Sequence, residues 1–185
     1  MLFRSLTVLL VLNFYNPAFS SIKKKVISQL QFTNNLSFDF IQMIDKKKED
    51  GKCIIKYPKK IWCTYNNSSK KIIVSNGKSL VVKNINSGNY FIYSLKRTPL
   101  EFLLDKEYLI SKVNALEPVE IDSKYLHFKI VENNLEINIF FNKKDFNLVG
   151  WQTIDIYQNL SVTFISSVKI NQEIDDAIFV LPKNE

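Results

Sequence analysis

The sequence predicts a mainly β protein with a few short helices, built on a curved antiparallel sheet. The first observation is the stretch 51–82, where apolar residues recur in four short runs separated by turn signals. Pro58 interrupts the first hairpin because proline cannot donate to a ladder, and Asn76-Gly77 predicts a type I′ turn. The second observation is a series of further apolar runs after residue 118. About ten or eleven strands, paired sequentially throughout, must curl toward a barrel or leave edges exposed.

Residues 1–20 have the features of a secretory signal peptide. Arg4 supplies the positive start, residues 6–12 supply the apolar run, and small residues precede a cleavage point before Ser21. The apolar run is too short for a membrane-spanning helix. We therefore expect an exported protein with a single domain, residues 21–185.

The first elements of that domain follow from local patterns. Residues 21–31 carry apolar side chains at helical spacing and predict an amphipathic helix. Residues 36–45 alternate and predict a strand, with Gln42 on its apolar face as a satisfied buried amide. Residues 46–51 are polar and predict a turn.

The rest of the chain mixes short helices with strands. A strand is predicted at 90–94. Helices are predicted at 98–104, where Thr98 caps and Pro99 takes the first position, and at 106–113. The later strands are expected at 119–121, 125–131, 135–141, 148–157 and 160–168, before an apolar anchor at 178–182.

Cys53 and Cys63 are the only cysteines. If the hairpin turns about Pro58, the two residues face each other across neighbouring strands, close enough for a disulfide. An exported protein with an even cysteine count favours a structural bond. The alternative, a redox-active pair, needs surroundings that lower a thiol pKa, and nothing nearby in the sequence supplies them.

Composition argues against several classes of function. The formal charge is +7, but the lysine runs are scattered and Arg97 is the one arginine after the signal segment, so nucleic-acid binding is not expected. His127 is the single histidine and is expected to be structural, so no metal site and no cofactor are predicted. The carboxylates around the helices are expected to be solvated rather than catalytic (Asp105, Glu107, Glu117, Glu120 and Asp122).

The apolar content leaves one function class open. Fourteen phenylalanines are more than an ordinary core of this size needs, which indicates an apolar cavity or simply an AT-biased genome. A curved sheet covered by helices suits an apolar ligand. An acyl chain gains about 0.8 kcal/mol per CH₂ on leaving water, so such a cavity can carry lipid through an aqueous compartment.

Several motifs, in their order and spacing, resemble the LolA family of periplasmic lipoprotein carriers. They are Phe40-x-Gln42; Gly51 with Tyr57-Pro58, Trp62 and Tyr65; Ser75-Asn76-Gly77-Lys78-x-Leu80; Thr98-Pro99-Leu100 with Leu103-Leu104; and Leu148, Trp151, Asp155, Asn171, Phe179 and Pro182. The resemblance implies an unclosed β-barrel of the LolA/LolB type with a helical lid over a hydrophobic cavity. It also implies a monomer in the periplasm, no enzymatic activity, loading by the inner-membrane LolCDE complex, and delivery of acylated lipoproteins to an outer-membrane acceptor such as LolB.

The same resemblance assigns residues to the site. The cavity wall is expected to include Phe40, Trp62, Leu80 and Trp151, and the underside of the lid Leu100, Leu103 and Leu104. The family usually has an arginine before the proline, where it helps hold the lid closed. Here that position is Tyr57, so lid control falls to Lys56, Arg97 or the Tyr57 hydroxyl. The cysteine pair is also outside the family pattern.

Three other functions stay open at this point. The protein could bind a different lipid or glycolipid cargo, use Asp or Glu carboxylates as a hydrolase, or serve only as a structural protein of the envelope.

Overall fold

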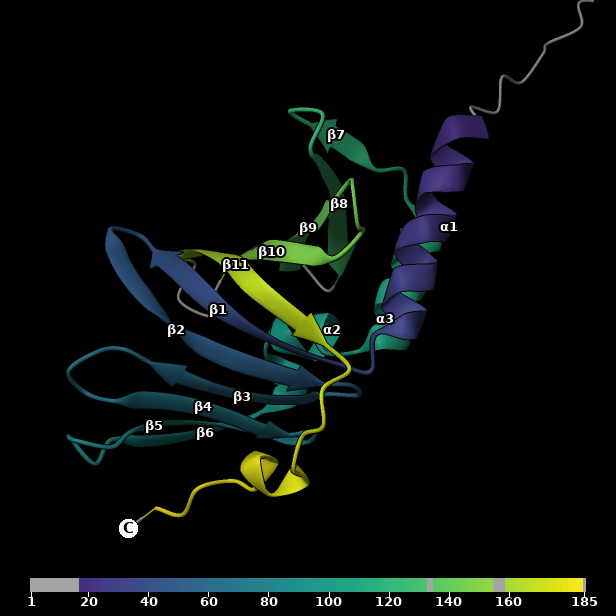
Figure 1. Cartoon of the computed structure of the whole chain (residues 1–185). Helices are drawn as coiled ribbons and strands as arrows, with labels where there is room; N and C mark the ends of the chain where they lie inside the picture. The colour runs from purple at the N-terminus through teal and green to yellow at the C-terminus, as the bar shows by residue number, and fades with distance from the viewer. Residues whose placement is uncertain (1–16, 133–134, 155–158, 185) are drawn as a thin grey trace, which may run out of the picture.

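The protein folds as one antiparallel sheet that bends around a core and does not close. The computed structural model describes residues 17–132, 135–154 and 159–184. The sheet has 11 strands in the order β6-β5-β4-β3-β2-β1-β11-β10-β9-β8-β7. The strands are β1 (Asn35–Ile44), β2 (Lys47–Lys56), β3 (Lys60–Tyr65), β4 (Lys71–Asn76), β5 (Ser79–Asn84), β6 (Tyr90–Ser94), β7 (Val119–Ile121), β8 (Tyr125–Glu132), β9 (Leu135–Asn142), β10 (Leu148–Ile154) and β11 (Leu160–Ile170). The mainly β, unclosed barrel that the sequence predicts is confirmed (Figure 1).

The expectation that pairing is sequential throughout is wrong at one place. Strands β1–β6 and β7–β11 each pair in sequence, but β1 also pairs with β11, which joins the two runs. Strands β6 and β7 are the two edges of the sheet. The chain between them forms η1 (Leu95–Arg97), α2 (Leu100–Leu103) and α3 (Lys106–Ala115). The helical insert therefore separates the two strands whose pairing would close a barrel.

The helices lie along one side of the sheet. The N-terminal helix α1 (Pro17–Phe32) is longer than the predicted 21–31 and packs against α3. The Lys23 ammonium of α1 donates to the Glu117 carboxylate at 2.6 Å, just beyond α3. Helix α1 begins before the predicted cleavage point at Ser21, and the rest of the predicted signal segment lies outside the described residues. No helix in the described part of the chain is long and apolar enough to cross a membrane.

Two local predictions in the first hairpins need correction. Residues 47–51 belong to β2, which pairs with β1 along its full length, instead of forming a turn. The segment is polar because Lys47, Lys48 and Asp50 are exposed and the buried Glu49 is ion-paired with Lys71. In the β4–β5 turn the backbone has positive φ at Gly77 (95°) but not at Asn76. Because Gly77 is the first of two loop residues, the turn has the glycine position of type II′ rather than type I′.

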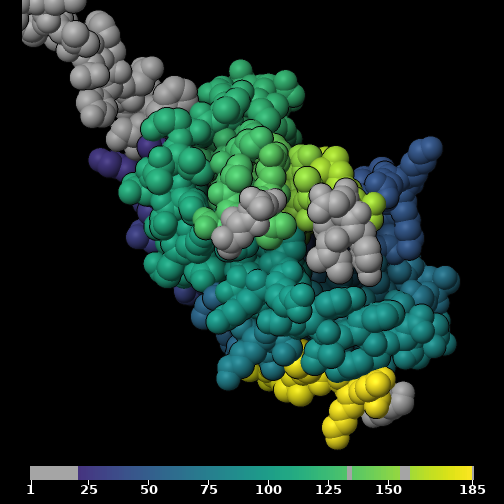
Figure 2. Space-filling model, turned by 180° about the vertical axis from the view of Figure 1, so that it is seen from behind, coloured from purple at the N-terminus to yellow at the C-terminus, as the bar shows by residue number. Residues whose placement is uncertain are grey.

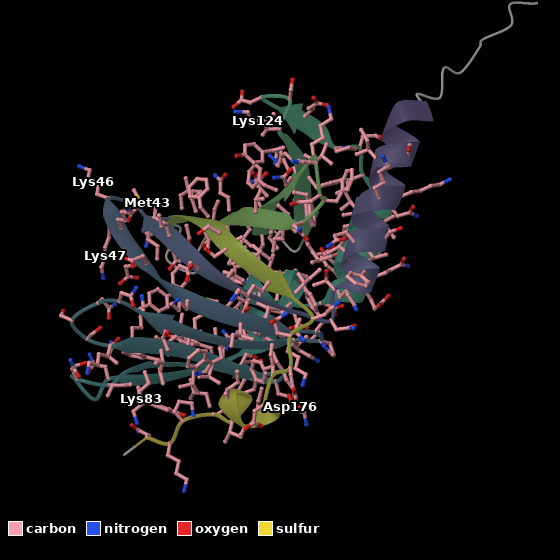
Figure 3. All side chains as sticks on the ribbon, viewed as in Figure 1. Met43, Lys46, Lys47, Lys83, Lys124 and Asp176 are labelled. Atoms are coloured by element: carbon pink, nitrogen blue, oxygen red, sulfur yellow. A yellow bond between two sulfur atoms is a disulfide. The ribbon has the colours of Figure 1, made fainter. Side chains whose placement is uncertain are left out.

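The outer face of the sheet is covered at β3 and β4 by the 3₁₀ helix η2 (Asp176–Phe179). Phe179 is buried there, and Lys60 lies 5.8 Å from its ring centroid. Asp176 accepts hydrogen bonds from Lys56 (2.9 Å) and Lys60 (3.1 Å), and Figure 3 shows it beside these strands. The C-terminal segment thus covers part of the outer face of β3 and β4.

A disulfide joins Cys53 of β2 to Cys63 of β3, which are direct cross-strand partners. Both residues are buried on the inner face of the sheet. A bond across a sequence separation of 10 residues removes only modest entropy from the unfolded chain.

Replacing both cysteines by alanine is expected to lower the free energy of unfolding by about 2–3 kcal/mol. Chemical denaturation measures this difference. Reducing agent should destabilise the wild-type protein by a similar amount and leave the Cys53→Ala/Cys63→Ala variant unchanged. Equal stability of the two proteins under oxidising conditions would contradict the expectation.

Candidate functional site

A cavity of about 670 Å³ lies on the inner face of the sheet, next to the segment that joins β6 to α2. Its lining residues come from six consecutive strands, from β10 and β11 and from η1–α2, and most of them are apolar. The apolar ones are Phe40, Ile44, Cys53, Ile61, Cys63, Ile73, Leu80, Val82, Ile92, Tyr93, Pro99, Leu100 and Trp151. The volume is within the range of about 300–1,000 Å³ typical of small-molecule sites. Figure 2 shows the molecule from behind, where the teal segment that includes α2 lies next to the green strands.

Two aromatic rings pack together in the cavity wall. Phe40 of β1 and Tyr65 of β3 both oppose Gly51 of β2, and their ring centroids are 4.8 Å apart. A Cβ atom on Gly51 would lie 2.9 Å from the Phe40 ring and even closer to the backbone of β3. The glycine therefore lets the two rings meet across the strand between them.

Polar groups in the wall bond to one another. The Gln42 amide donates to the hydroxyls of Ser161 and Thr163, each at 3.2 Å, and the Tyr65 hydroxyl donates to the Gln42 carbonyl oxygen at 3.1 Å. The predicted satisfied amide is present in this network, although Gln42 is only half-buried. The wall can therefore face an apolar ligand without an unsatisfied polar atom.

A buried ion pair adjoins the same wall. Lys71 of β4 lines the cavity, lies 3.8 Å from the Tyr65 ring centroid and donates to the Glu49 carboxylate of β2. Burial alone would raise the pKa of Glu49, but hydrogen bonds from Lys71, Lys47 and Asn67 outweigh it and hold that pKa below its usual value. Burial lowers the pKa of Lys71, against the effect of Glu49. The Lys71 charge is thus compensated inside the protein.

The exposed lining residues all come from one segment, which defines the mouth of the cavity. They are Ile92 and Ser94 of β6 and Arg97 of η1. Every other lining residue is buried or half-buried. The described lining is thus exposed beside the edge strand β6 and buried at the aromatic pair.

The structure brings together four of the seven residues that the resemblance assigned to the cavity and lid: Phe40, Leu80, Trp151 and Leu100. Trp62 does not line the cavity. It alternates with Ile61 and Cys63 and so lies on the outer face of β3, where its neighbour on β4 is Val74.

Leu103 and Leu104 do not line the cavity either. Both are fully buried in the core. Helix α2 is a single turn, so only its start reaches the cavity, through Leu100 and the preceding Pro99. The lid surface is therefore the segment from η1 to the first residue of α2.

Tyr57 does not contact the lid through its hydroxyl. Its ring packs against the core under α3, with Lys106 5.9 Å from the ring centroid, and burial raises the pKa of its hydroxyl. Lys56 pairs with Asp176 on the outer face. Arg97 has no ion pair within the described residues. None of the three candidates for lid control therefore holds α2.

The residue that holds α2 is Lys59, which the sequence interpretation missed. Its ammonium pairs with Glu101 at 2.6 Å and Asp105 at 3.2 Å, and its backbone N–H donates to the Leu104 carbonyl at 2.8 Å. The hydrogen bond to Glu101 raises the pKa of Lys59. The spacing of Glu101 and Asp105, four residues apart at a predicted helix, was a usable signal for a shared cation.

Replacing Lys59 by methionine is expected to loosen α2 while costing no more than about 1 kcal/mol of stability, because the pair is partly solvated. Hydrogen exchange at the amides of Leu103 and Leu104 should accelerate. Lys60→Met is the matched control, since Lys60 pairs with Asp176 of η2 instead. Unchanged exchange in Lys59→Met would show that α2 is held by packing alone.

Comparison with protein families assigns the chain. Residues 31–182 match the model for the outer membrane lipoprotein carrier protein LolA, which is most of the sequence. The chain belongs to the LolA family. The match covers every strand of the sheet and the whole helical insert. No curated protein matches the sequence.

Solved structures with the LolA-like fold are similar in shape at low sequence identity. One is an uncharacterized conserved protein from Thermus thermophilus, with a TM-score of 0.53, 8% identity, and coverage of 90% of this chain and 95% of that one. Another, from Vibrio parahaemolyticus, is described as an outer membrane lipoprotein-sorting protein domain, with a TM-score of 0.52, 6% identity, and coverage of 89% and 97%. These likenesses support the fold.

Proposed function

We propose that this protein is a periplasmic carrier that receives acylated lipoproteins and holds their acyl chains in the cavity during transfer to the outer membrane. The observation that carries the proposal is the cavity of about 670 Å³, with its mostly apolar lining and its aromatic pair, in a LolA-family fold. Loading by LolCDE, delivery to a LolB-type acceptor, and action as a monomer without nucleic acid are parts of the same proposal.

A role without catalysis or cofactor fits the cavity wall. None of the five carboxylates around the helical insert lines the cavity. Asp105 caps α3 and pairs with Lys59, and Glu120 pairs with Lys143. His127 bonds to Asn138 at 2.7 Å and stacks on Phe140. No group of three or more metal-ligating side chains occurs among the residues that the structure describes.

A photo-crosslinking residue at Ile92 tests the proposal in cells that make the protein. Ile92 is at the cavity mouth, whereas Phe164 of β11 is similarly exposed and does not line the cavity. We expect lipoprotein adducts at position 92 and none at 164. The adducts should disappear when the acylated cysteine of the lipoprotein is replaced. A folded protein without adducts at position 92 would contradict the proposal.

A further inference from the structure

The charges in the cavity lining are of one sign. Lys71 and Arg97 are the only charged residues among the described residues that line it. They differ in what surrounds them. Lys71 has 17% of its side chain exposed and is paired with Glu49, whereas Arg97 is exposed at the mouth and has no ion pair in the described part of the chain. The uncompensated charge of the cavity is therefore the Arg97 guanidinium.

Four of the polar groups in the wall are already hydrogen-bonded. Gln42, Ser161, Thr163 and Tyr65 bond to one another. At the mouth, the Thr98 hydroxyl donates to the Leu95 carbonyl at 2.9 Å. Among the described lining residues, the charged donor without an ion pair is therefore Arg97, with the Ser94 hydroxyl three residues earlier in the same segment.

We infer that the cavity binds amphiphiles with an acidic head, a carboxylate or a phosphate, which pairs with Arg97 while the acyl chain lies against Phe40 and Trp151. Guanidinium is suited to this role because its planar fork pairs with carboxylate or phosphate through two hydrogen bonds. The inference rests on the proposed function only in that an acyl chain enters the cavity. It adds a selective contact for an acidic head.

The test compares ligands that share a chain and differ in the head. Oleate and oleyl alcohol are each titrated into the protein. Their affinities are measured by the displacement of a bound fluorescent fatty-acid probe. Lysophosphatidate and monooleoylglycerol form the second pair, which separates a phosphate head from a carboxylate. We expect the acidic member of at least one pair to bind about tenfold more tightly, equivalent to one charge-assisted hydrogen bond.

The variant Arg97→Gln should lose this preference, and its affinity for oleate should depend less on salt. Lys96→Gln is the matched control, because it removes the same charge from the neighbouring exposed residue, which does not line the cavity. Equal binding of acidic and neutral ligands by the wild-type protein, or an unchanged preference in Arg97→Gln, would overturn the inference alone. Failure of every ligand to displace the probe would overturn it together with the proposed function.

Discussion

Replacing Ile73 by tryptophan is expected to abolish binding of acyl ligands. Ile73 of β4 lines the cavity and pairs with Val82 of β5, which lines it too. The added ring would occupy space that the ligand needs. Exclusion of about four CH₂ groups costs about 3 kcal/mol, so affinity should fall by more than about 100-fold. Displacement of a fluorescent fatty acid measures the loss.

The adjacent residue supplies the control. Ile72 lies on the opposite face of β4 and does not line the cavity. Ile72→Trp therefore introduces the same side chain on the same strand and should bind ligand as the wild type does. Thermal unfolding followed by circular dichroism checks that both variants fold. Equal affinities of the two variants would place the ligand elsewhere on the protein.

The architecture was predictable because local signals agree with one another along most of the chain. The hairpin about Pro58 set the register that pairs Cys53 with Cys63, and β7 has the predicted bounds. The pairing of β1 with β11 was not predictable in the same way. It joins segments more than 100 residues apart, and no local pattern encodes such a contact.

The position of the cavity wall could be predicted from the sequence only in part. Phe40 and Leu80 line the cavity, but Trp62 does not. Strand β3 carries Trp62 on its outer face, which η2 contacts. Alternation alone cannot tell which face of such a strand is inner. The helical spacing of Leu100, Leu103 and Leu104 predicted that all three face the cavity, but only Leu100 does. Helix α2 is a single turn between the cavity and the core, so its residues contact both.

Lid control was missed because it depends on a tertiary contact. Lys59 reaches Glu101 across 42 positions in the sequence. The resemblance directed attention to position 57, whereas the ammonium that pairs with Glu101 belongs to Lys59. A basic residue next to the hairpin turn and two carboxylates on one helix are each common, so neither pattern identifies the pair without the other.

Removing the lysine of the buried ion pair is expected to have the largest effect on stability. In Lys71→Met the Glu49 carboxylate, 5% exposed, loses its buried partner and keeps only Lys47, which is 73% exposed, and the Asn67 amide. Breaking a buried pair by removing one partner costs about 3–5 kcal/mol, and the remaining partners reduce this to about 3–4 kcal/mol. Urea denaturation at neutral pH measures the change.

Two further variants test whether the loss of stability comes from the Glu49–Lys71 ion pair. Lys47→Met removes the exposed partner and should change stability by less than about 1 kcal/mol. Figure 3 shows Lys47 at the tip of the β1–β2 hairpin. Glu49→Gln/Lys71→Met removes both buried charges and should recover most of the loss. A double variant as unstable as Lys71→Met would show that the lysine stabilises the fold by packing on Tyr65 instead of by charge.

The pair also predicts how stability depends on pH. Because the folded pKa of Glu49 is below its ordinary value of 4.5, its contribution is present above that pH and is lost as the pH falls through the folded pKa. The pKa values of four other carboxyl groups are also lowered, so several carboxylates make the wild-type protein less stable as the pH falls. They are Asp39, Glu132, Glu136 and Asp176. The difference in free energy of unfolding between the wild type and Glu49→Gln isolates the contribution of Glu49. That difference should shrink below pH 4.5, and a constant difference across the range would mean that Glu49 titrates alike in the folded and unfolded chains.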